Sequence, residues 1–148
     1  MNIMADAKEE KKLDELATFY LGDTLLGIDA LGVQEIIKDI GITPVHQANP
    51  YILGIINLRG RIVTVVDLKK KLDLPESEVT GDTRVIIVDS DGEYVGFLVD
   101  SVSDIIHVAN DAIGPPPSNM NEVLGGFLKG VYSTSRGLVA LLDTDRVL

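Results

Sequence analysis

The sequence contains no cysteine, no tryptophan and only two histidines, His46 and His107. The missing cysteines exclude a disulfide framework and thiol chemistry. Aromatic residues make up 5% of the chain, which leaves few rings for the stacking platforms of single-strand nucleic-acid binders. No apolar run approaches the ~18 residues that a membrane span needs, and the N-terminus lacks the basic start and apolar core of a signal peptide. We therefore expect a cytoplasmic protein that does not insert directly into a membrane.

Basic residues are also scarce, since 13 Lys and Arg stand against 23 Asp and Glu for a formal charge of −10. The one basic cluster, Lys69–Lys71, has acidic residues around it. Nucleic-acid binding usually depends on clustered Lys and Arg that displace counterions from phosphates. The charge balance therefore predicts no nucleic-acid partner.

The sequence offers little of what an enzyme needs. The two histidines have no second ligand at metal-binding spacing, and no phosphate-binding loop or nucleophile elbow occurs. Asp67 and Asp143 each follow an apolar run, where an Asp commonly caps the next helix or turn. We predict no cofactor, no metal and no catalytic residue. The alternatives are a small carboxylate-dependent hydrolase that uses Asp67 and Asp143 with a histidine, and another ligand-binding β-barrel module.

What the chain does contain is a series of short aliphatic and β-branched runs separated by turn residues. At this spacing the runs indicate an all-β sandwich or barrel with few helices. Helical turns are expected at Pro50–Leu53, with Asn49 as N-cap, and at Leu68–Leu72. The ten predicted strands are Ala17–Leu21, Leu25–Asp29, Val33–Ile37, Gly54–Asn57, Ile62–Leu68, Val85–Asp89, Tyr94–Val99, Ile105–Val108, Gly126–Tyr132 and Gly137–Asp143.

An internal repeat refines this fold class. The segment from Leu26 to Lys38 aligns with that from Val95 to His107, so that Gly27 meets Gly96 and Glu35 meets Asp104. The apolar run before Asp67 likewise aligns with the run before Asp143. The repeat predicts two similar five-stranded barrels that share an interface and a groove, because each half alone is too small to be stable. We expect a flexible tail over residues 1–14, one subdomain over 15–82 and another over 83–148, with some strands exchanged.

The segment Gly54–Leu68 reads as strand, turn and strand, and its turn is unusually polar. Asn57 and Arg59 lie directly against apolar strands, which suggests a fixed cluster of hydrogen-bond donors presented to a partner. Two roles for Arg59 are open. It either pairs with Glu35 or Asp67 and makes the first barrel rigid, or it faces a protein partner, where Arg is a favoured hot-spot residue. The Asn57–Gly60 turn has no evident counterpart in the second half, where Leu128–Gly130 is the nearest match.

These motifs resemble the CheW family of chemotaxis coupling proteins. The family's V-x-E-I segment is matched by Val33–Ile36, and its block around NLRG is matched by Pro44 and Gly54–Leu68. The second half matches too, at Val95–Ile106 and Gly137–Asp143. The similarity runs from about residue 16 to the last residue.

The resemblance implies two intertwined five-stranded barrels of the Src-homology-3-like type. It also implies a non-enzymatic adaptor that couples the cytoplasmic tips of methyl-accepting chemoreceptors to the histidine kinase CheA through the kinase's regulatory domain, and that is recruited to membrane-associated receptor arrays. The receptor-facing residues implied by the likeness are Val33, Glu35, Ile36, Asn57, Arg59 and Gly60. For the kinase we select one strand of the second barrel, through Tyr94, Gly96, Phe97 and Val99.

Overall fold

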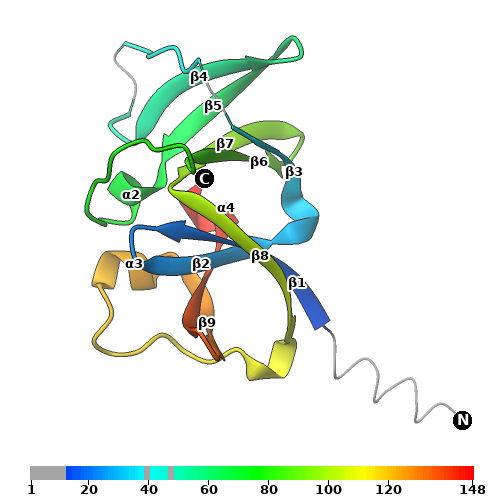
Figure 1. Ribbon diagram of the computed structural model, residues 1–148, viewed down its shortest axis with the longest axis vertical. Helices are drawn as coiled ribbons and strands as arrows, with labels where there is room; N and C mark the ends of the chain where they lie inside the picture. The colour runs from blue at the N-terminus through cyan, green and yellow to red at the C-terminus, as the bar shows by residue number, and fades with distance from the viewer. Residues whose placement is uncertain (1–12, 39–40, 47–48) are drawn as a thin grey trace, which may run out of the picture.

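The fold consists of two five-stranded sheets stacked along the long axis of the molecule (Figure 1). The computed structural model describes residues 13–38, 41–46 and 49–148. Sheet A contains, in spatial order, β8 (Ser101–Ala109), β1 (Leu13–Leu21), β2 (Thr24–Asp29), β10 (Gly137–Leu142) and β9 (Leu128–Thr134). Sheet B contains β3 (Val33–Ile37), β6 (Arg84–Ser90), β7 (Glu93–Val99), β5 (Arg61–Asp67) and β4 (Ile52–Leu58). The all-β prediction is confirmed, and each predicted strand is present.

Several predicted segment boundaries differ from the structure; β8, for example, begins at Ser101 rather than at Ile105. The expected flexible tail ran to residue 14, but Leu13 and Asp14 already pair with Ala109 and Val108 of β8; the rest of that tail lies outside the described residues. The ninth strand begins at Leu128 rather than Gly126, because Glu122–Gly126 forms the short helix α3. The Asn121 side chain caps α3 by accepting a hydrogen bond of 2.9 Å from the backbone N–H of Val123.

One of the two predicted helical turns is confirmed. Helix α2 (Leu68–Lys71) follows β5 directly, and Asp67 caps it by accepting from the N–H of Lys70 at 3.2 Å. The helix expected at Pro50–Leu53 is wrong. There the Oδ1 atom of Asn49 accepts a hydrogen bond of 3.0 Å from the N–H of Tyr51, and the backbone carbonyl of Asn49 accepts one of 2.9 Å from the N–H of Ile52. Strand β4 begins at Ile52. An asparagine side chain that accepts from a backbone N–H two residues later can begin either a turn or a helix. Here β4 pairs with β5 directly afterwards, so the segment forms a turn.

The sheets exchange strands between the two halves of the chain in a reciprocal way. Sheet A joins the first and second strands of the first half to the third, fourth and fifth strands of the second half, and sheet B does the reverse. Antiparallel hairpins build most of each sheet, and one parallel pair in each, β2 with β10 and β5 with β7, joins the halves. The boundary between residues 82 and 83 therefore does not coincide with the boundary between the sheets.

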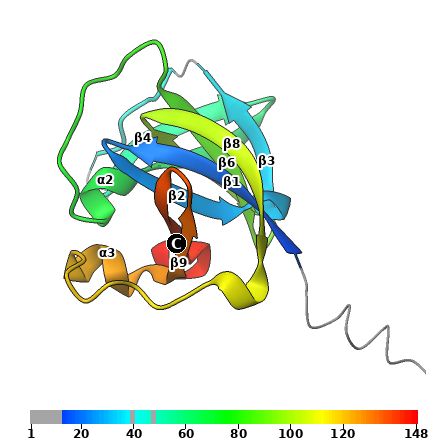
Figure 2. The same ribbon diagram turned by 60° about the horizontal axis from the view of Figure 1, so that its bottom comes forward.

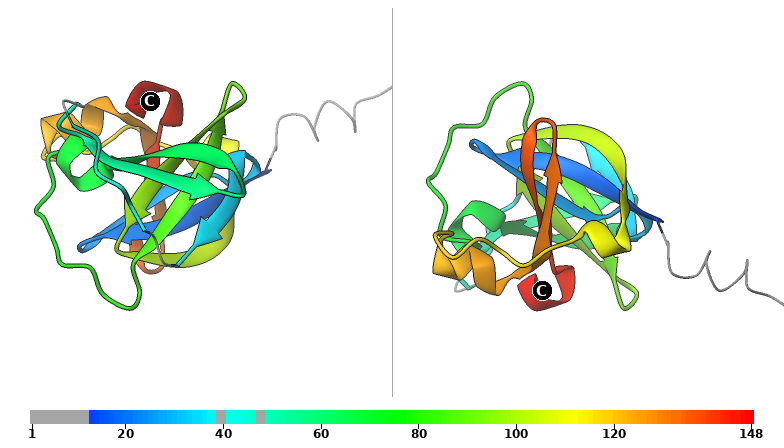
Figure 3. Two further views of the ribbon diagram at one scale, coloured as in Figure 1. Left: turned by 90° about the horizontal axis from the view of Figure 1, so that it is seen from above. Right: turned by 90° about the horizontal axis from the view of Figure 1, so that it is seen from below.

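The register of the two parallel pairs shows the internal repeat directly. Gly27 lies opposite Leu141, and Gly96 lies opposite Val65. Both glycines are tightly packed, since a Cβ atom on Gly96 would lie 2.7 Å from Cγ1 of Val85 and one on Gly27 would lie 3.3 Å from Cγ1 of Val139. Figure 3 shows the β4–β5 hairpin across one end of the molecule and the β9–β10 hairpin across the other.

The largest core cluster draws buried side chains from both sheets, among them Phe19 and Leu26 of sheet A and Phe97 of sheet B. Leu68 and Leu72 at α2, and Val147 of α4 (Thr144–Val147), pack into the same cluster. Helices α3 and α4 lie close together (Figure 2), and Arg146 Nη1 donates to the carbonyl of Gly126 at 3.2 Å. Among the described residues, no helix is long and apolar enough to cross a membrane.

Candidate functional site

The turn between β4 and β5 is a two-residue hairpin with a defined backbone. Leu58 pairs with Arg61, and the two residues between them, Arg59 and Gly60, have φ values of +54° and +82°. Positive φ at both central positions is what a type I′ turn requires. The Oδ1 atom of Asn57 accepts a hydrogen bond of 2.8 Å from the N–H of Gly60. Asn57 therefore fixes the turn as an acceptor, which differs from the donor role expected from the sequence.

Arg59 forms an ion pair with Glu35, which confirms one of the two contacts predicted for it. Asp67, the other predicted partner, caps α2 instead. Strands β3 and β4 occupy opposite edges of sheet B, so this ion pair closes the sheet across its open side. The Arg59 side chain stays 75% exposed, whereas that of Glu35 is 26% exposed. The Oε2 atom of Glu35 is buried and has no hydrogen-bond partner in the described part of the chain.

The six residues implied as receptor-facing come together at one end of sheet B. Along β3 the burial alternates, so Val33 and Glu35 turn inward while Ile36 is 42% exposed. Asn57, Arg59 and Gly60 are exposed on the hairpin, and Arg59 reaches Glu35. We call these six residues the hairpin surface.

Two exposed apolar residues beside the hairpin surface escaped the sequence reasoning. Leu31 is 85% exposed in the short 3-10 turn η1 (Ala30–Gly32), directly before β3, and Ile62 is 59% exposed directly after the turn. The sequence could have indicated that Leu31 is exposed, because this residue lies between Ala30 and Gly32 in a connection between two strands, where no strand alternation places it in the core. Ile62 carries no such signal, because it stands in a nearly unbroken apolar run, and only the structure shows that Val63 faces the core and Ile62 the solvent.

Three of the four residues predicted to face the kinase are buried, so the prediction that they form a contact surface is wrong. Gly96 is buried, and Phe97 and Val99 have 0% exposure, because β7 lies in the middle of sheet B and directs these positions into the core. A residue without accessible surface cannot contact a partner. Tyr94 is half-buried under the guanidinium of Arg61, which lies 3.6 Å from the centre of its ring. Its hydroxyl group donates to Oε1 of Gln34 at 3.3 Å.

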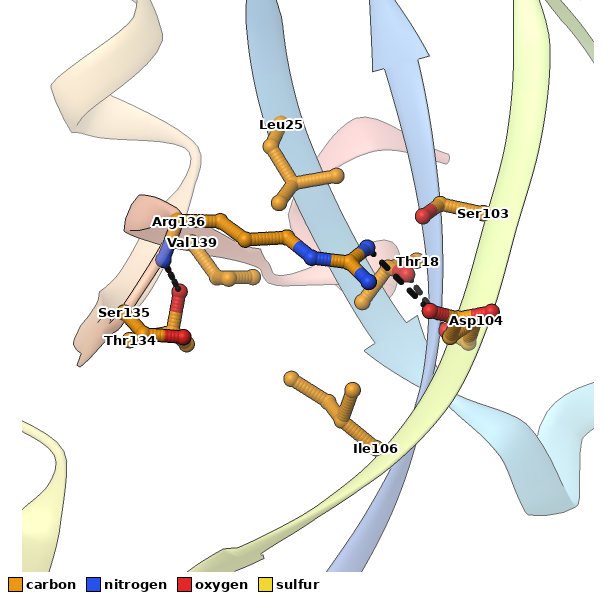
Figure 4. Close-up of a pocket in the computed structure, with 9 residues that line it drawn as sticks. All are labelled: Thr18, Leu25, Ser103, Asp104, Ile106, Thr134, Ser135, Arg136 and Val139. Atoms are coloured by element: carbon orange, nitrogen blue, oxygen red, sulfur yellow. Dashed lines mark hydrogen bonds and ion pairs between the residues drawn. The ribbon is translucent and has the colours of Figure 1, made fainter.

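Sheet A carries a counterpart of the Glu35–Arg59 ion pair. Arg136, in the turn between β9 and β10, lies 3.2 Å from Asp104 of β8, the residue that aligns with Glu35. Figure 4 shows Arg136 extended from the hairpin toward Asp104 across a small cavity of about 210 Å³, with Leu25 and Ile106 on either side. The sequence reasoning placed the nearest match at Leu128–Gly130. It missed this turn because the arginine is shifted by one position within it.

The two ion pairs differ in burial. Arg136 and Asp104 are 66% and 67% exposed, so solvent screens their interaction. Glu35 is 26% exposed, so its interaction with Arg59 is less screened than the sheet A pair. Of the two ion pairs, the one on the hairpin surface therefore has the better shielded carboxylate.

A second polar cluster connects the two sheets at the crossover from β7 to β8. Lys69 Nζ lies 2.7 Å from Oδ1 of Asp100, with side-chain exposures of 8% and 21%. Ser77 Oγ donates to the same carboxylate at 2.8 Å, and the N–H of Gly22 donates to its other oxygen at 2.6 Å. Burial raises the pKa of Asp100, but the hydrogen bonds from Lys69, Gly22 and Ser77 outweigh it and leave that pKa below its ordinary value. This cluster fixes the chain where it passes from one sheet to the other.

The carboxylates considered for hydrolysis have structural contacts. Asp67 caps α2, as predicted. Asp143 stands at the N-cap of α4 but makes no side-chain cap hydrogen bond, and its carboxylate instead lies 3.5 Å from Nε of Arg146. Within residues 13–38, 41–46 and 49–148 there is no group of three His, Asp or Glu side chains able to hold a metal ion.

Comparison with known proteins connects this geometry to a family. The family model described as a CheW-like domain matches residues 15–148. The chain is 33% identical to a chemotaxis protein CheW of Rhizobium meliloti over 90% of its own length and 86% of the relative's. It is 32% identical to the corresponding protein of Bacillus subtilis, over 95% and 90% of the two chains.

A solved structure is similar over nearly the whole fold. The scaffolding protein TtCheW from Thermoanaerobacter tengcongensis superimposes with a TM-score of 0.80 at 33% sequence identity, covering 88% of this chain and 89% of that one. The chain therefore belongs to the CheW-like domain family, a family of chemotaxis scaffolding proteins rather than enzymes.

Proposed function

We propose that the protein couples the cytoplasmic tips of chemoreceptors to the histidine kinase CheA, by binding both the receptor tips and the regulatory domain of the kinase. The observation that supports this function is the hairpin surface, where a hydrogen-bonded turn and an ion pair hold an exposed arginine beside the exposed Ile36. Arginine is one of the residue types enriched in interaction hot spots. In the cell the protein is then cytoplasmic and recruited to membrane-associated receptor arrays.

The apolar residues around this surface suit a helical partner. Ile36, Ile62 and Leu31 are exposed on the segments that surround Glu35 and Arg59. A helix binds such a surface by laying apolar anchors between charged residues, and this mode of binding needs no catalytic group. We assign the hairpin surface to the receptor tips. Tyr94, the one accessible member of the kinase set, stays a prediction for the kinase side.

The test is a binding measurement with two purified partners, a receptor-tip fragment and the CheA regulatory domain. We expect Arg59→Glu to weaken receptor binding by more than ~1 kcal/mol while kinase binding is retained, because the substitution places a carboxylate beside Glu35 and removes an exposed hot-spot residue. Wild-type protein that binds neither partner would contradict the proposal.

A matched control is available in the second sheet. Arg136→Glu removes the equivalent ion pair with Asp104 and is expected to leave receptor binding unchanged. The double variant Glu35→Arg/Arg59→Glu then separates the two roles of Arg59, because it restores an ion pair with the charges exchanged. If this variant recovers receptor binding, Arg59 acts by ordering the hairpin. If binding stays weak although the fold is stable, the side chains of this ion pair contact the receptor directly, and Glu35→Gln alone then separates the part of Glu35 from that of Arg59.

A further inference from the structure

A groove of about 600 Å³ lies between strands β5 and β7 of sheet B and helix α4. Its floor consists of Val66 on β5 and Val95 on β7, and its walls are the segment before β4 and helix α4 after β10. The groove thus lies where sheet B meets an element that follows sheet A. Its size falls in the range of about 300–1,000 Å³ that is typical of ligand sites.

One end of this groove holds an ammonium group that aromatic rings, rather than carboxylates, keep in place. Lys71 Nζ lies 4.8 Å from the ring centre of Tyr51 and 5.8 Å from that of Phe127. Among the described residues Lys71 takes part in no ion pair. A cation–π contact orients an ammonium group without neutralising its charge. Lys71 therefore presents a positioned positive charge to anything that enters the groove.

The groove also carries three carboxylates. Asp91 and Glu93 of the β6–β7 hairpin and Asp145 of α4 line it, and none of the three forms an ion pair within the described part of the chain. Three unpaired carboxylates disfavour phosphates, nucleotides and other anions. They favour a ligand with several positive charges, and the apolar floor favours one that also has aliphatic side chains.

We propose that this groove is a docking site for a basic, amphipathic polypeptide segment of a protein partner. In this arrangement its aliphatic side chains lie on Val66 and Val95, its lysines or arginines face Asp91, Glu93 and Asp145, and one carboxylate near its end pairs with Lys71. The site is separate from the hairpin surface, so it does not depend on the coupling function proposed above.

The test uses a synthetic amphipathic peptide with leucines on one face, lysines along the flank and a single glutamate at one end. Calorimetry with the full chain measures its affinity, and amide chemical shifts locate its site. We expect shift changes at Thr64, Val66, Val95 and Lys71, and weaker binding of a peptide with the same composition in scrambled order. Equal affinity for the scrambled peptide, or shift changes spread over the acidic surface, would overturn the proposal.

Charge exchange at Lys71 gives the sharper result. Lys71→Glu is expected to weaken binding of the peptide by about threefold or more, an effect in the upper range of those measured for partly exposed ion pairs. Replacing the peptide's glutamate by lysine is expected to restore the affinity for the Lys71→Glu variant. The control is Lys70→Glu, which changes the same charge on the same helix at an exposed position that does not line the groove. An equal loss with Lys70→Glu, or no rescue by the exchanged peptide, would refute the role of Lys71.

Discussion

At the scale of single residues, the two repeated glycines, Gly27 and Gly96, show how closely the strands pack. Each lies on the strand that pairs in parallel with a strand from the other half. Neither has a backbone conformation that requires glycine, so the reason for both is the space that neighbouring valine side chains occupy. A methyl group at Gly96 meets Cγ1 of Val85 at 2.7 Å, closer than a real contact allows.

We therefore predict that Gly96→Ala destabilises the fold by about 1–3 kcal/mol, the usual cost of overpacking a closed core. Gly27→Ala is expected to cost less, since its closest neighbour is 3.3 Å away. Chemical denaturation measures both. The control is Gly32→Ala, which meets no atom within 4 Å, and a similar loss of stability in that variant would contradict the packing explanation.

The turn residues of the hairpin surface give a second prediction. Gly60 has φ of +82° and an open environment, so an alanine there is strained by its backbone conformation rather than by a clash. Gly60→Ala is expected to cost about 1 kcal/mol, and urea denaturation measures the loss. Gly81→Ala, at a glycine in equally open space without a positive φ, serves as the control. An equal effect at both positions would contradict the assigned turn geometry.

At the scale of elements, the fold depends on how the chain crosses between the sheets. Asp100 stands between β7 in sheet B and β8 in sheet A, and it accepts hydrogen bonds from α2, from the loop after α2 and from the turn between β1 and β2. These contacts join segments that are distant in the sequence. The crossover therefore fixes the position of α2 against the first hairpin of sheet A.

This arrangement predicts a defined pH dependence. Because the pKa of Asp100 in the folded protein lies below its ordinary value of 3.8, the carboxylate stabilises the fold fully above that pH and loses its contribution as the pH falls below it. We expect Asp100→Asn to cost about 2–3 kcal/mol at neutral pH and to flatten the loss of stability at acid pH.

Denaturation curves recorded from neutral to acid pH test this prediction. The control is Asp23→Asn, which removes a carboxylate from the exposed turn between β1 and β2, beside Gly22. If Asp100→Asn has the same acid dependence as wild type, another group controls stability in that range.

At the scale of the whole molecule, the reciprocal exchange of strands makes the two sheets interdependent. Sheet A lacks three of its strands without the second half of the chain, and sheet B lacks three of its strands without the first half. The largest buried cluster also takes side chains from both sheets. We therefore expect the protein to unfold in one cooperative transition.

Separate fragments covering residues 1–82 and 83–148 test this interdependence. Each alone is expected to lack a stable β-sheet signal in circular dichroism, because a parallel pair and most of the core are missing. An equimolar mixture is expected to recover it. Independent folding of either fragment would show that the halves are separable subdomains.

Much of the local structure could be predicted from the sequence because its causes are local. Alternating apolar residues define the strands, Asp67 caps α2, and Gly60 marks the turn between β4 and β5. Where local chemistry permits two outcomes, as at Asn49, the prediction failed and pairing between strands decided.

The sequence by itself determined the all-β class, the internal repeat and the polar hairpin that marks the candidate site. Only the tertiary structure decided which strands share a sheet, that Arg59 pairs with Glu35 rather than Asp67, and that Phe97 and Val99 are buried. It also placed Arg136 against Asp104, a likeness that alignment missed. The physical reason is that patterns of two to four residues specify strands and turns. Contacts between edges of a closed sheet depend instead on the path of the entire chain.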